Sequence, residues 1–240
     1  MKYLDVTFAD PARNLACDEA LIDFCEADAG GAEVLRIWEP ANYFVVLGYS
    51  NRVSREVDVD ACAARAIPIL RRFSGGGAVL QGPGCMNYTL VMRNERPGHV
   101  GDVGKAYRRV LEPHRRIFAI LTSAAVEIEG ISDLAIAGRK FSGNSQHRKR
   151  ACTMFHGTFL LSFDFSLVEA CLRMPSRQPF YRQDRAHGSF LRNLPIDPLQ
   201  VRKALRQEWQ ANDELLDFSY QRLEDLLRNR YSCSDWNSKY

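Results

Sequence analysis

The stretch RRFSGGGAVLQGPGCMNY, residues 71–88, places three consecutive glycines between two apolar segments. Because the glycines at 75–77 carry no side chains, their backbone can adopt positive φ and a ligand can approach it closely. Arg71 and Arg72 come directly before them and bring fixed positive charge to the same place. This combination favours an anionic ligand that carries phosphate. Taken alone, the stretch also fits a glycine-rich turn between two strands with arginines on the solvated edge.

Length and composition indicate a globular protein with a substantial core. The chain has 240 residues, of which 46% are hydrophobic and 25% are charged, as is usual for a soluble domain. No apolar run approaches the ~20 residues that a membrane-spanning helix needs. The first residues, MKYLDVTFADPARN, contain no apolar core of a signal peptide. We therefore expect a cytoplasmic protein without a membrane partner.

The cysteines and histidines show no metal-ligand or disulfide pattern. The seven cysteines are scattered without CxxC spacing, which argues against a disulfide framework and a structural zinc site. Most are expected to be small buried hydrophobic residues. The histidines at 99, 114, 147 and 187 lack the spacing of metal ligands as well. We therefore predict no metal on protein side chains.

The formal net charge of +3 is small, but its distribution is uneven. Between Asp133 and Asp164 there is no acidic residue, while five basic residues fall in this window: Arg139, Lys140, Arg148, Lys149 and Arg150. Such a window suits phosphate, an acidic protein partner or RNA, and a solvated basic loop is the structural alternative.

Strand and helix patterns alternate along the chain. Strand patterns lie at residues 3–8, 34–38, 43–47, 87–92, 126–128, 133–137, 140–146 and 153–163. Helix patterns begin at the Asp-Pro pairs 10–11 and 197–198 and also cover 58–65, 103–123 and 220–228. Pro113 is expected to kink or divide the long helix, residues 175–188 to be irregular, and the tail after Ser232 to fray. Several strands in direct succession predict an α+β fold, with a mixed sheet flanked by helices.

The second informative stretch is GRKFSGNSQHRKRACTMFHG, residues 138–157. Lys140 lies close to the small or polar residues Ser142, Gly143 and Asn144. If Lys140 faces the same cleft as the glycines, its ammonium group can neutralise an α-phosphate and polarise an acyl carbonyl. An exposed, ordinary lysine is the alternative for a lysine on a strand.

Two further residues of this stretch have both a chemical and a structural interpretation. His156 suits a general base, although a histidine beside a strand is more often structural. Cys152 lies in basic surroundings that would favour its thiolate and make it an acyl-accepting nucleophile. The alternative is a buried, inert thiol.

Together the two stretches resemble a known family. RRFSGGGAVLQGPGCMNY is similar to the RRxSGGGxVxHxxGN segment of lipoate-protein ligases in the biotin/lipoate A/B protein ligase family, and GRKFSGNSQ followed by FHGTFLL resembles their lysine motif. NLACDEAL (14–21), WEPANYFVVLGYSN (38–51) and HGSFLRNL (187–194) extend the similarity in order over roughly the first 195 residues. Gln81 and Cys85 stand where the family motif has histidine and asparagine.

The resemblance implies a fold and a division of the chain. The fold would be a largely antiparallel mixed sheet flanked by helices, of the class II synthetase-like type found in biotinyl and lipoyl ligase catalytic domains. Residues 1–195 would form the catalytic domain. Residues 196–240 would form a helical extension packed on it, too short for a full accessory domain with its own core. A separate accessory subunit therefore stays an open alternative.

The resemblance also implies roles by position. Lys140 would be catalytic, binding the acyl carbonyl and the adenylate phosphate. The substrate and ATP site would comprise Arg71, Arg72, Ser74, Gly75, Gly76, Gly77, Ala78, Val79, Leu80, Asn87, Ser142, Gly143, Asn144 and His156. In the implied reaction, lipoate or a similar short acyl acid attacks ATP, accompanied by Mg²⁺, to form lipoyl-AMP. The lysine of a lipoyl-domain carrier then attacks the anhydride, and the basic window would steer an acidic carrier.

Two other functions remain open from the sequence. One is an ATP-independent octanoyl or lipoyl transferase that forms a thioester on Cys152 or Cys85. The other is a non-catalytic module that binds protein or RNA through the basic window. The intact glycines and Lys140 favour the ligase, for which we expect no nucleic-acid partner.

Overall fold

The computed structural model describes residues 1–28, 30–95 and 102–240. Its main sheet has eight strands in the order β11-β1-β2-β6-β10-β9-β8-β7, and a smaller sheet has the order β4-β3-β5. The main-sheet strands are β1 (Lys2–Leu4), β2 (Val34–Trp38), β6 (Cys85–Arg93), β7 (Glu127–Glu129), β8 (Asp133–Ile136), β9 (Arg139–Arg148), β10 (Cys152–Leu160) and β11 (Asp213–Glu214). The smaller sheet contains β3 (Phe44–Leu47), β4 (Ile69–Arg71) and β5 (Val79–Gln81).

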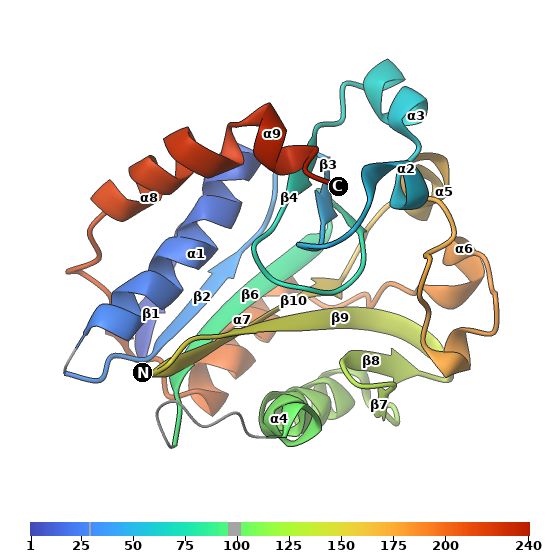
Figure 1. Cartoon of the computed structure of the whole chain (residues 1–240). Helices are drawn as coiled ribbons and strands as arrows, with labels where there is room; N and C mark the ends of the chain where they lie inside the picture. The colour runs from blue at the N-terminus through green and yellow to red at the C-terminus, as the bar shows by residue number, and fades with distance from the viewer. Residues whose placement is uncertain (29, 96–101) are drawn as a thin grey trace.

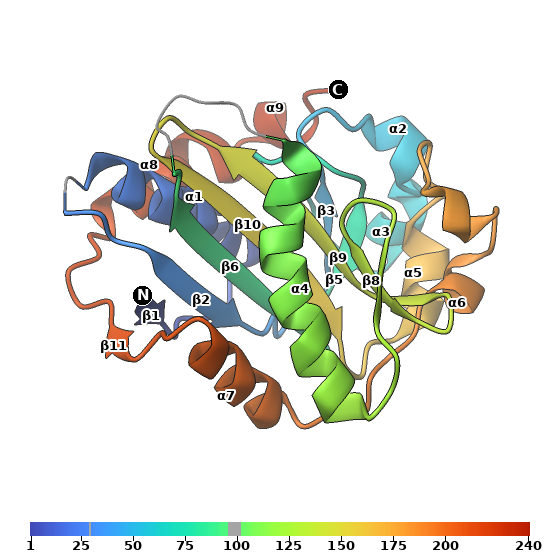
Figure 2. The same cartoon turned by 90° about the horizontal axis from the view of Figure 1, so that it is seen from below.

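Helices pack around both sheets. They are α1 (Pro11–Ala27), α2 (Val53–Glu56), α3 (Val59–Ala64), α4 (Val103–Thr122), α5 (Phe165–Cys171), α6 (His187–Phe190), α7 (Pro198–Glu208), α8 (Gln221–Leu226) and α9 (Ser234–Asn237), with the 3₁₀-helix η1 (Phe180–Arg182) and the π-helix η2 (Leu227–Tyr231). In Figure 1, α1 and α8 lie side by side over one face. In Figure 2, α4 and α7 cross the other. The predicted α+β fold with a largely antiparallel sheet is confirmed.

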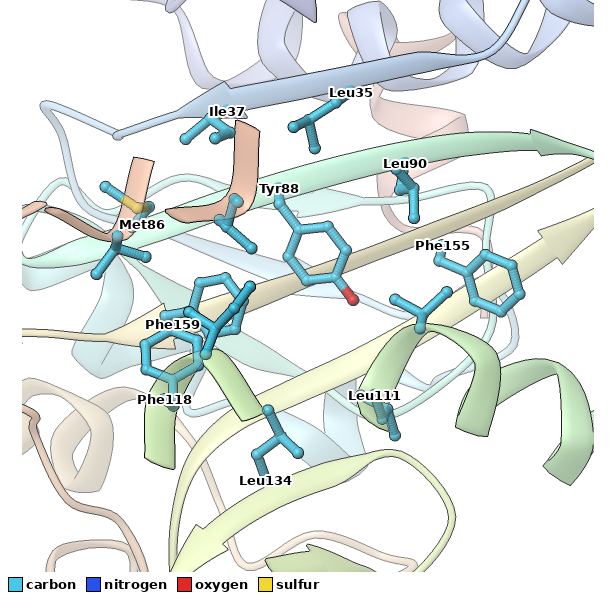
Figure 3. Close-up of a cluster of buried hydrophobic side chains, with 14 of the residues drawn as sticks. Leu35, Ile37, Met86, Tyr88, Leu90, Leu111, Phe118, Leu134, Phe155 and Phe159 are labelled. Carbon is cyan, nitrogen blue, oxygen red and sulfur yellow. The ribbon is translucent and has the colours of Figure 1, made fainter. Parts of the chain in front are cut away.

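Strict alternation along the central strands creates two different faces. On β6, Tyr88 and Leu90 point into the core beneath α4 and α7, whereas Val91 packs in the core beneath α1. Figure 3 shows the first core, where the rings of Tyr88 and Phe159 stack at 5.4 Å between centroids and Phe118 from α4 packs at 4.5 Å from Phe159. The intervening positions, among them Asn87, are therefore free to face the side that carries the smaller sheet.

One core histidine leads to a prediction about acid stability. His114 on α4 is fully buried and accepts a hydrogen bond from Trp209 Nε1 at 3.0 Å. Burial lowers the pKa of His114 from 6.5 to about 3, so the folded state keeps it neutral while the unfolded state binds a proton below pH 6.5. Stability is therefore lost as the pH falls through that range, by about 2 kcal/mol between pH 7 and pH 5 from this residue.

Urea unfolding at pH 7 and pH 5 measures this effect. His114→Gln keeps an acceptor for Trp209 but cannot titrate, so its loss of stability between the two pH values is expected to be smaller than that of the wild type. Equal losses in the two proteins would contradict the assignment.

The helix α4 runs without interruption through Pro113, so the expectation that proline divides it is wrong. A proline removes only one backbone hydrogen bond from the helix. In α4 the flanking residues Val110, Leu111, Ile117 and Phe118 are all buried in the core beneath the sheet. Packing along the whole apolar face outweighs the missing bond, as tertiary contacts commonly do.

The C-terminal residues pack against the rest of the chain, so the expectation of a frayed tail after Ser232 is wrong. The helix α9 contacts β4, and Trp236 Nε1 donates a hydrogen bond to the carbonyl of Arg71 at 2.9 Å. The backbone N–H of Val53 donates to the carbonyl of Tyr240 at 3.1 Å. Earlier in the chain, the short strand β11 pairs in parallel with β1 and forms an edge of the main sheet. This strand was not predicted from the sequence.

Candidate active site

A cleft of about 600 Å³ lies between the main sheet and the smaller sheet. The structure brings ten of the predicted site residues to it: Arg72, Gly76, Gly77, Ala78, Val79, Asn87, Lys140, Gly143, Asn144 and His156. Four others lie beside the cleft without lining it: Ser74, Gly75, Leu80 and Ser142. The two motifs, about seventy residues apart in the sequence, therefore line one cavity.

The side chain of Arg72 stabilises the backbone of the glycine loop. Its guanidinium donates hydrogen bonds to the carbonyls of Gly75 and Gly77, at 2.7 and 2.9 Å from Nη2, and to Ser74 Oγ at 3.1 Å from Nε. Gly76 has φ +92°, and an added Cβ would lie 2.7 Å from Arg72 Nη2. Burial lowers the pKa of Arg72 to about 10, so it remains charged at neutral pH. Arg72 acts here as a scaffold for the loop backbone.

The two other glycines of this loop allow a matched test. A Cβ at either Gly75 or Gly77 would meet no heavy atom within 4 Å, but only Gly77 lines the cleft. Gly77→Ala is expected to leave stability within about 0.5 kcal/mol, and to weaken ligand binding because its methyl group occupies space that a ligand needs. Calorimetric titration with ATP measures the binding.

Gly75→Ala is the control for Gly77→Ala and is expected to give the same result as the wild type in a titration with ATP, the nucleotide that the resemblance implies. If both variants bind with unchanged affinity, the ligand does not approach the loop at Gly77.

Lys140 projects from β9 over the backbone of Gly143. Its Nζ forms an ion pair with Asp133 Oδ1 at 2.8 Å, and a Cβ at Gly143 would lie only 2.7 Å from Nζ. Tyr181 donates a hydrogen bond to the other oxygen of Asp133 at 2.9 Å. Burial and the neighbouring carboxylate raise the pKa of Tyr181, so its hydroxyl stays a donor. The carboxylate thus fixes the position of the ammonium group at the cleft wall.

The segment between α5 and α6 supplies a second cation. Arg182 is buried and lines the cleft, and its guanidinium carbon lies 4.8 Å from the centre of the Phe190 ring. Its Nε donates to the carbonyl of Arg185, but Nη2 has no hydrogen-bond partner among the described residues. Burial lowers the pKa of Arg182, from a value high enough to leave it charged. A buried guanidinium group of a cleft-lining residue is suited to an anionic ligand.

His156 belongs to a buried polar chain that reaches α1. Ser74 Oγ and His156 Nε2 are hydrogen bonded at 2.6 Å, and His156 Nδ1 lies 3.8 Å from Asp18 Oδ2. Burial lowers the pKa of His156, which keeps the ring neutral at pH 7. For Asp18, burial is the largest influence and opposes ionisation, but the Arg36 guanidinium at 2.7 Å, His156 and the Thr89 hydroxyl together outweigh it and hold the pKa below its usual value. This chain fixes the glycine loop to the first helix.

Arg71, predicted beside Arg72 in the ATP site, does not line the cleft. Its side chain is fully buried and donates to backbone carbonyls on the far side of β4. Neighbouring residues on a strand point to opposite faces, so only one of the two arginines can face the cavity. The structure places Arg71 between the loop after β3 and α9.

The cysteines lie away from the cleft. Cys152 and Cys85 are buried, and in the described part of the chain no cysteine lines the cavity. Burial raises the pKa of Cys152, and that of Cys85 to about 12. Both are therefore protonated thiols at neutral pH.

The site also contains residues that were not predicted from the sequence, among them Asp18, Asp133, Tyr181 and Arg182. The signal for Asp18 was an acidic pair, DE, between apolar residues of the first helix. The signal for Tyr181 and Arg182 was an aromatic cluster among arginines in the irregular segment. Asp133 marks the start of the window without acidic residues, and no local pattern indicates its role.

The basic window is partly paired. Lys149 forms an ion pair with Asp23, and Arg139 donates to the carbonyl of Leu191 at 2.6 Å. Residues 1–28, 30–95 and 102–240 contain no group of three or more metal-ligating side chains, and His99 lies outside them. Within the same residues, no helix has both the length and the apolar character needed to cross a membrane.

Comparison with known proteins places this site in a family context. Residues 10–199 match the model of the lipoyl protein ligase A/B catalytic domain. A protein of Aeropyrum pernix assigned as a lipoate-protein ligase A is 30% identical over 210 residues, covering 87% of this chain and 74% of that protein. The octanoyltransferase LipM of Kyrpidia tusciae is 27% identical over 262 residues, covering 94% of both chains. Other relatives of similar identity carry the same octanoyltransferase name.

The fold is shared with a solved structure from Thermoplasma acidophilum. That structure is described as a bipartite lipoate protein ligase and its E2 lipoyl domain. It superposes with a TM-score of 0.83 at 22% identity, over 99% of this chain and 95% of that one.

Proposed function

The chain belongs to the lipoyl protein ligase A/B catalytic domain family, and from this premise we propose that it is an ATP-dependent lipoate-protein ligase. It would activate lipoate or a similar short acyl acid as the acyl adenylate and transfer the acyl group to a lysine of a lipoyl-domain protein. The observation that carries this proposal is that Lys140 and the backbone at Gly77 face one cleft that no cysteine of the described residues lines.

The arrangement suits acyl-adenylate formation. Lys140 Nζ, held by Asp133, would lie beside the α-phosphate and the acyl carbonyl, where negative charge develops as the carboxylate attacks. Arg182, which also lines the cleft, would provide the second positive group for phosphate. Gly76 and Gly77 would let the nucleotide approach the loop backbone. Mg²⁺ would accompany ATP, balancing charge on the phosphates.

A thioester mechanism is less well supported by the geometry. A cysteine transferase needs a thiolate that the acyl carbonyl can reach. Cys152 and Cys85 are buried, and burial raises the pKa of each thiol. Because several relatives are named octanoyltransferases, this second function should be tested directly.

The acceptor and the domain organisation follow from the same proposal. A lipoyl domain would present its lysine at the open side of the cleft, and the exposed part of the basic window, Arg150 in particular, would favour an acidic carrier. We place the catalytic domain at residues 1–195 and the extension packed on it at 196–240. Lipoylation by this protein alone, in the assay described next, would show that no separate accessory subunit is required.

Mass spectrometry of a lipoyl domain distinguishes the two mechanisms. The protein is incubated with the domain and either lipoate plus ATP or an octanoyl carrier protein alone. The ligase proposal predicts a mass gain and pyrophosphate release only in the first mixture. Acyl transfer from the carrier without pyrophosphate, abolished in Cys152→Ser or Cys85→Ser, would replace it with the transferase. RNA binding with a steep salt dependence and no reaction in either mixture would favour a non-catalytic module.

A further inference from the structure

Side chains of α9 cover the outer edge of β4, the strand that leads into the glycine loop. β4 lies at one end of the smaller sheet, and Arg71, its last residue, is paired with Leu47 of β3. On the other side, where Figure 1 shows α9 beside β4, the backbone N–H of Arg71 donates to Asn237 Oδ1 at 2.9 Å. The backbone carbonyl of Arg71 accepts from Trp236 Nε1 at 2.9 Å. Two side chains thus satisfy the backbone groups that a further strand would otherwise pair.

These two side chains are themselves held by η2 and α1. Asn237 Nδ2 donates to the carbonyl of Tyr231 at 3.0 Å, and the rings of Trp236 and Tyr231 meet edge to face at 6.2 Å between centroids. Tyr231 is fully buried, and its hydroxyl donates to Glu19 Oε2 on α1 at 2.7 Å. The guanidinium carbon of Arg230 lies 4.7 Å from the centre of the Trp236 ring. Trp236 and Asn237 therefore connect the end of β4 to the packed core.

Arg71 is followed by the arginine that stabilises the glycine loop. The backbone N–H of Arg72 donates to the carbonyl of Leu47 at 2.9 Å, and its guanidinium donates to two carbonyls of the loop. The carbonyl that Trp236 binds belongs to the same planar peptide unit as the N–H of Arg72. Loss of that hydrogen bond would free the peptide unit to turn. Such a turn would displace the guanidinium of Arg72 and the loop carbonyls bound to it.

A second connection runs through the loop after β3. The backbone N–H of Tyr49 donates to the carbonyl of Ser74 at 2.8 Å. The Tyr49 ring lies 5.8 Å from the Trp236 ring, between centroids, and Lys239 Nζ donates to the Tyr49 hydroxyl at 2.9 Å. The segment that contains Trp236 therefore supports the glycine loop at a second point.

The glycine loop has little packing of its own. Gly75, Gly76 and Gly77 are exposed, and a Cβ at the first or third would meet no heavy atom of the described residues within 4 Å. Three glycines in succession also have a large backbone entropy to lose when they are fixed. The conformation of the loop therefore depends on the hydrogen bonds from Arg72 and Tyr49, and so on the side chains that fix these two residues.

We propose that Trp236 and Asn237 are positioning residues of the candidate active site, which hold the glycine loop in the conformation that binds the nucleotide. Neither residue lines the cleft, so they act through the backbone at Arg71 and through the ring of Tyr49. The nucleotide part of this inference rests on the proposed function, whereas the support of the loop does not.

Kinetics of two variants separate this role from a merely structural one. Trp236→Phe keeps an aromatic ring but removes the N–H that binds the carbonyl of Arg71, and Asn237→Ala removes the acceptor of the Arg71 N–H. In ATP–pyrophosphate exchange with lipoate, each variant is expected to raise the KM for ATP about tenfold, because the loop is competent to bind for a smaller fraction of the time. The kcat should stay within about twofold, because no contact of Lys140 is changed. A loss of folded protein would instead lower kcat and leave the KM unchanged.

Trp209→Phe is the matched control. It also removes an indole N–H, the donor to His114 at 3.0 Å, but this bond lies in the core beneath α4 and α7. We expect Trp209→Phe to unfold at a lower temperature than the wild type with an unchanged KM for ATP. A similar rise in KM in this control would assign the effect to general destabilisation and overturn the inference. An unchanged KM in both Trp236→Phe and Asn237→Ala would overturn it as well.

Amide hydrogen exchange tests the support of the loop without any ligand. The backbone N–H groups of Tyr49 and Arg72 should exchange about tenfold faster in Trp236→Phe and Asn237→Ala than in the wild type. Unchanged exchange in the central strand β6 would show that each variant is folded. Equal rates at Tyr49 and Arg72 in all three proteins would overturn the inference whether or not the protein binds ATP. If the wild type neither binds ATP nor exchanges pyrophosphate, the proposed function fails, and faster exchange at the two amides still shows that α9 holds the glycine loop.

Discussion

Replacing Lys140 with methionine is expected to lower acid-dependent ATP–pyrophosphate exchange by about 10²–10³-fold. Methionine has a similar length and apolar stem, so the backbone of β9 and the packing near Gly143 should be kept. What it removes is the ammonium group that Asp133 holds at 2.8 Å on the cleft wall. A fixed charge in a partly enclosed site acts on the transition state without reorganisation, so its loss should reduce kcat more than it weakens binding.

Two further variants make this result specific. Lys203→Met removes a lysine of α7 that lies in a different surface depression, between α4 and α7, and should exchange like the wild type. Asp133→Asn keeps a side chain of the same shape but removes the negative charge that positions Nζ, and should have an intermediate rate. Exchange by Lys140→Met at the wild-type rate would show that the ammonium group is not part of the reacting site.

The fold could largely be predicted because its signals are local. The β-branched, aromatic and other apolar residues of the segment that becomes β2, and the strand patterns of those that become β8, β9 and β10, indicate the strands locally. The aspartate-proline pairs give the starts of α1 and α7. The two-residue strand β11 has no comparable signal: its residues Asp213 and Glu214 are charged and exposed. It forms where residues 213–215 pair with β1 and the following chain buries Leu215 and Phe218 in the core beneath α1. Because this edge strand depends on tertiary packing, it could not be predicted from local sequence.

Only those site residues that belong to a sequence motif could be predicted. Lys140 and the glycines were expected to share a cleft, and the structure places them there. The partners of Lys140 were not predictable, because Tyr181 is 48 residues from Asp133 and the two meet only once β8 and the segment after α5 are side by side. Arg71 and Arg72 are adjacent, and the motif that contains them does not indicate which of the two faces the cavity.

Replacing Arg71 with methionine is expected to destabilise the protein by about 3–5 kcal/mol. The guanidinium is fully buried and donates from Nη1 to the carbonyls of Gly48, Tyr49 and Asn51, at 3.0, 3.0 and 2.8 Å. Its other nitrogens donate to the carbonyls of Trp236 and Asn237, at 3.1 and 3.2 Å. Methionine fills most of the volume but removes the donor from five carbonyl groups, that of Gly48 in a buried hydrogen bond and the other four in part-buried ones.

These carbonyl groups lie in two different segments, so the loss of Arg71 should loosen both. Three belong to the loop after β3, which contacts the glycine loop: a Cβ at Gly48 would lie only 2.0 Å from the carbonyl oxygen of Gly76. The other two belong to α9. Arg71 therefore ties the C-terminal helix to the loop that supports the cleft, so that Arg71→Met should loosen both.

Urea unfolding measures the loss of stability, with Arg65→Met as the control. Arg65 is exposed and its Nη1 makes one hydrogen bond, to the carbonyl of Ala61 at 2.9 Å, so that variant should stay within about 0.5 kcal/mol of the wild type. Limited proteolysis adds a local readout, because cleavage after α8 should become faster in Arg71→Met than in Arg65→Met. If the two variants unfold at the same urea concentration, the buried arginine is not what holds α9 against the fold.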